Sequence, residues 1–182
     1  MTQSEVQKQL DRFSKSVIKE ARKNLTTLKK NHTKGLWQSL KGNVKAMPNS
    51  LSIDFQMNLY GQFQDKGVKG ANPSLVKNGK QKAPNSPFSF KSKMPPVDPL
   101  SKWAQKKNIR FRNADGTYAK GGYKTLGFWL QKRIFAQGIK PSLFFTKPFE
   151  AAFKRLPNQL IEKFGLDAVN LFKETQFKNE KK

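Results

Sequence analysis

The stretch from Leu51 to Phe63 alternates apolar and polar residues, with one break at Gly61. Strict alternation predicts a β-strand that has one face on a core and the other in water. A straight strand of this length is unusual, so we expect a bend or bulge at Gly61. This strand is expected to form the centre of an antiparallel sheet. Its predicted inward residues are Leu51, Ile53, Phe55, Met57, Leu59 and Phe63.

A long amphipathic helix is predicted from Ser4 to about Lys30, with Ser4 and Gln7 suited to a capping box. Its apolar residues recur at steps of three and four, which places them on one face. They are Val6, Leu10, Phe13, Val17, Ala21, Leu25 and Leu28. The other face is basic and is either solvated or directed at phosphates or an acidic neighbour. We expect the helix to pack on the sheet through Leu10, Phe13 and Val17.

Further elements follow from turn and capping signals. The predictions are a strand at 41–47, a turn at 47–50, a helix at 100–107, a hairpin turning at Asp115–Gly116, a helix from Thr125 to Gln137 and a last helical region that starts at Pro148 and breaks at Pro157. Residues 32–40 fit either a helical or an alternating period. The predicted fold is therefore α+β: an antiparallel sheet covered by the N-terminal helix and C-terminal helices. We expect a single domain over residues 1–172 and a frayed tail at 173–182.

Residues 67–99 carry six prolines and six lysines and little regular pattern. A structureless segment of this length is unusual in a compact domain and is often functional or disordered. One interpretation is an extended arm that orders against a neighbouring subunit; the other is a disordered loop without a partner. The residues expected at the subunit interface are Lys77, Lys80, Phe88, Phe90, Lys91 and Lys93.

Composition limits the possible functions. The chain has no cysteine, one histidine (His32) and a formal net charge of +24. Disulfides and cysteine-ligated metals are thereby excluded, and a reducing interior, or a particle assembled there, is indicated. No apolar run approaches the ~20 residues of a membrane span. The acidic residues are scattered, so we predict a non-enzymatic protein with no catalytic, cofactor-binding or metal-binding residues.

The positive charge implies an acidic partner or a polyanion, or else a solubilising surface. The segment 109–124 places aromatic residues among basic ones, as in proteins that bind single strands. Its candidate contacts to DNA or to an acidic partner are Arg110, Arg112, Lys120 and Lys124. The alternative is an ordinary basic hairpin.

Five phrases occur in a fixed order along residues 33–153. They are Thr-Lys-Gly-Leu-Trp-Gln-Ser-Leu (33–40), Tyr-Gly-Gln-Phe-Gln-Asp-Lys-Gly (60–67), Met-Pro-Pro-Val-Asp-Pro-Leu-Ser-Lys-Trp-Ala (94–104) leading to Lys107-Asn-Ile109, Lys-Arg-Ile-Phe-Ala-Gln-Gly (132–138) and Pro-Ser-Leu-Phe-Phe-Thr-Lys-Pro-Phe (141–149). This order resembles the minor tail, or tail-completion, family of long-tailed bacteriophages. The chain departs from that family at Lys66, where an acidic residue is usual, and in its basic segment 116–124.

The resemblance implies a structural virion protein that forms an oligomeric ring at the phage head–tail junction, after assembly in the host cytoplasm. Rings on the order of six or twelve copies are expected from the resemblance only. The implied partners are copies of the chain itself, the portal or adaptor, tail proteins and DNA in passage, with no membrane. The alternatives are a basic nucleic-acid-binding protein and an enzyme such as a nuclease, for which no catalytic constellation is visible.

Overall fold

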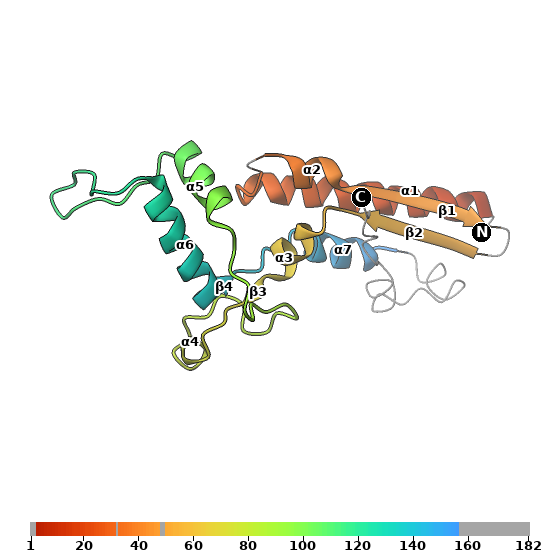
Figure 1. The fold of residues 1–182 in the computed structure, drawn as a ribbon. Helices are drawn as coiled ribbons and strands as arrows, with labels where there is room; N and C mark the ends of the chain where they lie inside the picture. The colour runs from red at the N-terminus through yellow and green to blue at the C-terminus, as the bar shows by residue number, and fades with distance from the viewer. Residues whose placement is uncertain (1–2, 32, 48–49, 157–182) are drawn as a thin grey trace. The chain divides into compact units, whose positions relative to one another are not determined.

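The computed structural model describes residues 3–31, 33–47 and 50–156 (Figure 1). The backbone forms two compact units: unit 1 is the chain up to Asp65 and from Ser142 onward, and unit 2 is Lys66–Pro141. The sequence predicts one domain over residues 1–172. The division arises because residues 66–141 form a separate two-stranded sheet and make most of their contacts with one another.

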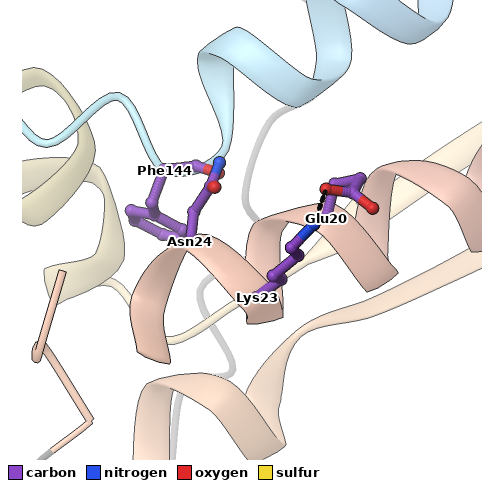
Figure 2. Close-up of polar contacts among 4 residues, drawn as sticks. All are labelled: Glu20, Lys23, Asn24 and Phe144. Atoms are coloured by element: carbon purple, nitrogen blue, oxygen red, sulfur yellow. Dashed lines mark hydrogen bonds and ion pairs between the residues drawn. The ribbon is translucent and has the colours of Figure 1, made fainter. Parts of the chain in front are cut away.

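Unit 1 begins with the long helix α1 (Gln3–Thr27). The predicted apolar stripe is buried from Val6 to Leu25, which confirms the helical period. Leu28 is instead 44% exposed, because it follows the last helical residue. Two polar contacts of α1 are drawn in Figure 2: the Asn24 side chain donates to the Phe144 carbonyl over 3.3 Å, and Lys23 pairs with Glu20 at 3.8 Å.

The sheet of unit 1 is a two-stranded antiparallel hairpin of β1 (Lys41–Met47) and β2 (Ser50–Gln56). Its register sets Val44 opposite Ile53 and Met47 opposite Ser50. The central residues of the predicted turn, Pro48 and Asn49, lie outside the described residues. The prediction of a central strand is wrong, since each strand has one partner among the described residues. The short helix α2 (Gly35–Ser39) precedes β1, so the helical alternative is the right one for these residues of the ambiguous segment.

The predicted strand does not continue to Phe63. It ends at Gln56, and helix α3 (Tyr60–Lys66) follows. Gly61 lies against Leu36 and Met57: a Cβ there would come within 2.7 Å of a Leu36 methyl and 2.5 Å of the Met57 sulfur. The glycine thus permits close packing of the helix in place of a bulge. Leu59, expected to face the core, is 55% exposed.

An aromatic cluster forms the core of unit 1. Phe55 of β2 packs edge-to-face on Phe13, Phe145 and Phe149, with ring centroids 6.2, 5.3 and 5.9 Å apart. Phe149 belongs to α7 (Thr146–Phe153), so this cluster ties α1, the sheet and α7 together. Packing of the sheet on α1 is confirmed for Leu10, Phe13 and Val17 with Ile53, Phe55 and Met57.

Asp65 is a buried acid at the end of α3, 4% exposed. Its carboxylate accepts hydrogen bonds from the Phe145 amide at 2.8 Å and from the Thr146 amide at 3.2 Å, and a further one from the Thr146 hydroxyl. Its backbone carbonyl accepts from the amides of Ser142 and Leu143. Asp65 therefore fixes the point at which the chain returns to unit 1.

Unit 2 is built on helices α5 (Val97–Lys106) and α6 (Tyr123–Gln137), which lie side by side (Figure 1). Gly127 of α6 permits this approach, because a Cβ there would come within 2.2 Å of the Ser101 hydroxyl. Helix α5 begins earlier than predicted, and α6 begins at Tyr123, with Gly122 in place of Thr125 as its N-cap. Gly138 ends α6 as predicted, with a φ of 82°.

Residues 67–99 carry little regular structure, as expected, but they are bonded within unit 2. Strand β3 (Val68–Lys69) pairs with β4 (Gly138–Ile139), and the short helix α4 is Ser74–Lys77. The buried Gln81 side chain donates to the Gly70 carbonyl at 2.7 Å and accepts from the Gly70 amide at 3.1 Å. The expected kink at Pro157 and the tail 173–182 lie outside the described residues.

None of the helices in the described ranges combines the length and the apolar character needed to cross a membrane.

Candidate functional site: a basic aromatic hairpin

The segment between α5 and α6 forms the hairpin that the sequence predicts. Arg112 and Tyr118 form an antiparallel bridge, and the Asn113 amide donates to the Thr117 carbonyl at 2.9 Å. Gly116 takes a φ of 84°, the left-handed conformation that a glycine adopts without strain. The Asp115–Gly116 turn is confirmed.

A side-chain turn stabilises the hairpin tip. The Asp115 carboxylate accepts from the Thr117 hydroxyl at 2.7 Å and from the Thr117 amide at 2.9 Å. Because these bonds favour the ionised acid, they lower the pKa of Asp115 below its ordinary value, the hydroxyl contributing most. The tip therefore carries a fixed negative charge at neutral pH among four basic residues of segment 109–124.

Two arginines stack on tyrosine rings along the hairpin. The Arg110 guanidinium lies 4.7 Å from the Tyr123 ring centre and 5.2 Å from that of Tyr118, and Arg112 lies 4.8 Å from Tyr118. Arg112 also donates to the Gly116 carbonyl at 3.0 Å. Exposed cation–π contacts are worth about 0.5–1 kcal/mol each. The stacks thus hold both charged groups in place while they stay exposed to solvent.

The base of the hairpin is fixed to α6 by aromatic packing. The Phe111 and Trp129 rings meet edge-to-face at 5.6 Å, and Arg133 lies 4.7 Å from the Trp129 ring centre. The Tyr123 hydroxyl donates to the Asn108 side chain at 3.0 Å. Trp129 and Arg133 were not among the predicted site residues. Their four-residue spacing on a helix was the only sequence signal for that pair.

The structure brings together half of the predicted contact residues. Arg110 and Arg112 share the Tyr118 ring. Lys120 follows the bridge and Lys124 lies in the first turn of α6, both exposed, and neither joins the arginine–tyrosine stack. The site is therefore an arginine–tyrosine surface with two lysines further along the chain.

Such a surface is chemically suited to a polyanion. Guanidinium groups bind phosphate or carboxylate oxygens, and exposed aromatic faces allow bases to stack. Tyr118 is 48% exposed and Trp129 42% exposed, so both rings retain accessible area.

The residues expected at a subunit interface lie in segment 67–99. The lysines Lys77, Lys80, Lys91 and Lys93 are exposed. Phe90 instead packs on Phe135 of the same unit, with ring centroids 5.9 Å apart, and Phe88 is half-buried. The lysines are thus accessible to a neighbour, whereas the two aromatic side chains are largely engaged within unit 2.

No group of three or more metal-ligating side chains occurs among the residues that the structure describes. His32 lies outside those residues.

Comparison of the chain with protein-family models, with curated proteins and with solved structures returned no match.

Proposed function

We propose that this chain is a non-enzymatic structural protein of a long-tailed bacteriophage that forms a ring at the head–tail junction. The proposal rests on where the fold places two of the five sequence phrases that resemble the family. Residues 60–67 and 141–149 are distant in sequence, yet Asp65 in the first accepts hydrogen bonds from Phe145 and Thr146 in the second. The resembling phrases therefore coincide with contacts that define the fold.

The glycines at the ends of two phrases support the same view. Gly67 and Gly138 both have positive φ, 72° and 82°. A Cβ at Gly67 would come within 2.5 Å of the Ile139 carbonyl oxygen, and one at Gly138 within 2.2 Å of the Val68 carbonyl oxygen. These positions require glycine on steric grounds, which explains why a shared fold would keep such phrases.

In the proposed ring, the exposed lysines Lys77, Lys80, Lys91 and Lys93 contact an adjacent copy, the portal or adaptor, or a tail protein. The basic aromatic hairpin supplies the surface for DNA in passage.

The deciding experiment is a mass measurement of the purified full-length chain at moderate and high salt, with and without DNA. A closed oligomer that persists in high salt without DNA supports the ring. A monomer at all salt concentrations contradicts it.

A variant tests the lysine contact in that oligomer. Replacing Lys77, Lys80, Lys91 and Lys93 by glutamine should lower the fraction of assembled protein. The matched control replaces Lys102, Lys106, Lys132 and Lys140, which are also exposed residues of unit 2, and should assemble normally. Equal assembly of both variants would remove these lysines from the interface.

A second function, nucleic-acid binding by a free protein, is favoured by the arginine–tyrosine surface of the hairpin. Removal of one phosphate-binding side chain should reduce the salt dependence of DNA binding by about one unit of slope, so replacing Arg110 and Arg112 by alanine should reduce it by about two. Replacing the exposed Lys102 and Lys106 is the charge-matched control. Steep, salt-sensitive binding by a monomer, weakened only by the arginine variant, would favour this function over the ring.

A further inference from the structure

Unit 1 contains a groove between α1 and β1, with a volume of about 690 Å³. Its apolar lining, called the floor below, consists of Ile18, Trp37 and Leu40, of which Leu40 is fully buried and the other two are partly buried. The β1 side is Lys41–Asn43, and no residue of β2 lines it. The groove therefore adjoins β1 at its first three residues and does not reach β2.

All the charged residues that line the groove are basic. Its basic lining residues are Lys15, Lys19, Arg22, Lys23 and Lys41, and none of the described lining residues is acidic. Glu20, next to the groove, pairs with Lys23 at 3.8 Å, but both side chains are largely exposed, so the pair offsets little of the charge.

Arg22 is held in one position at the groove. Its Nε donates to the Trp37 carbonyl at 3.1 Å and an Nη donates to the Leu40 carbonyl at 2.9 Å. Its guanidinium also lies 4.4 Å from the Trp37 ring centre. These contacts fix a positive charge against the connection from α2 to β1.

Three lysines form a row along α1: Lys15, Lys19 and Lys23, four residues apart. This lysine row repeats every ~6 Å along the helix axis. Side chains on one face of an extended strand repeat every ~6.6 Å. An extended peptide in the groove therefore places alternate side chains opposite successive lysines.

The outer edge of β1 offers main-chain hydrogen-bonding groups in addition to the positive charges of the lysine row. Among the described residues β1 pairs only with β2, so one edge of the strand is open to another strand. Alternate residues of an antiparallel strand direct both the amide and the carbonyl to that edge. Exposed strand edges bind extended peptides through main-chain hydrogen bonds.

We propose that the α1–β1 groove binds an extended acidic segment of a partner protein. The segment adds a third strand to β1 and sets alternate carboxylates against the lysine row, with its intervening apolar side chains on the floor. A second copy of this chain is the less suitable occupant of this groove, because no two of its acidic residues stand two positions apart in the sequence, as carboxylates on one face of an extended strand must. A nucleic acid would use the charges but neither the apolar floor nor the strand edge.

The test uses the full-length chain and a labelled peptide of alternating glutamate and valine, with binding followed by fluorescence anisotropy. We expect saturable binding and shifts of the Gly42 and Asn43 amide signals by NMR. Lys15→Glu combined with Lys19→Glu should weaken binding by at least about tenfold. The control Lys8→Glu changes an exposed lysine of α1 outside the groove and should alter binding little, since screening at physiological salt acts within about 8 Å.

Two further probes separate strand addition from simple charge attraction. The same peptide with N-methyl groups on alternate amides along one edge cannot pair with β1 and should bind at least about tenfold more weakly. A short oligothymidylate that binds as tightly as the peptide, with the same weakening in the Lys15/Lys19 variant, would show a general polyanion site and overturn the proposal. Absence of saturable peptide binding at about 1 mM, or unchanged binding of the N-methylated peptide, would overturn it as well.

Discussion

The carboxylate of Asp65 accepts a hydrogen bond from the backbone amide of Phe145, 2.8 Å away and 80 positions further along the chain. The neighbouring Thr146 amide and hydroxyl bind the same carboxylate. A single acid thus organises the start of α7 and the return of the chain to unit 1.

Asp65→Ala should lower the free energy of unfolding by about 3 kcal/mol, because buried donors lose their acceptor. Asp65→Asn keeps one oxygen for the two amides and should cost about 1 kcal/mol. Urea titration followed by circular dichroism measures both values. Glu150→Ala, which removes an exposed carboxylate from α7, is the control, and an equally large loss there would contradict the role of Asp65.

Phe55→Ala should cost about 3–5 kcal/mol of unfolding free energy, because it leaves a cavity among three aromatic rings. The adjacent Gln56 lies on the opposite face of β2, and Gln56→Ala should change stability by less than about 0.5 kcal/mol. Equal destabilisation by the two substitutions would argue against a sheet buried on one face. The measurement is the same urea titration.

Gly42→Ala should destabilise unit 1 by about 2 kcal/mol, since the new Cβ would meet the Ser14 hydroxyl at 2.2 Å. Ser14→Ala alone should be close to neutral, because this buried hydroxyl has no hydrogen-bond partner within the described ranges. In the Ser14→Ala background, Gly42→Ala should therefore reduce the free energy of unfolding by less than it does in the original sequence. A double-mutant cycle measures the difference, and strict additivity would show that the two residues do not meet.

The Asp115 carboxyl should titrate by NMR with a midpoint below the ordinary value for aspartate, since its hydrogen bonds to Thr117 lower its pKa. The folded pKa lies below the unfolded pKa, so the stabilisation of the turn is present above the unfolded pKa and is lost as pH falls through the folded one. Thr117→Val removes the hydroxyl, the larger cause, and should raise the midpoint, whereas Thr117→Ser should preserve it. A midpoint unmoved in Thr117→Val would rule out the side-chain bond.

Local sequence patterns correctly predicted the elements that are determined by neighbouring residues. The buried stripe of α1, the strand β1, the Asp115–Gly116 turn and the end of α6 at Gly138 all follow from periodicity or turn chemistry. Alternation past Gln56 failed as a guide, because the chain forms helix α3 there and Gly61 packs against Leu36, which is distant in sequence. Long-range packing decided between the two structures.

The candidate site likewise contains some features that local sequence patterns predict and others that depend on long-range packing. Arg110 and Arg112 were predicted as contacts because aromatic residues lie among basic ones near the Asp115–Gly116 turn. The packing of Phe111 on Trp129 depends on how the hairpin meets α6, which no spacing in the sequence reveals. Asp65 looked like one isolated acid among several, since its partners lie 80 and 81 positions away.

The carbonyl of Asp65, the last residue of the first segment of unit 1, accepts from the amides of Ser142 and Leu143 at 3.1 and 3.0 Å, where that unit resumes. The chain thus leaves unit 1 and re-enters it at one place, which makes unit 2 an insertion between two adjacent anchor points. Because the entropy of closing a loop grows only slowly with its length, such an insertion can be lengthened, shortened or exchanged at little cost to its host. An inserted unit of quite different size at this position should therefore leave the host unit unchanged.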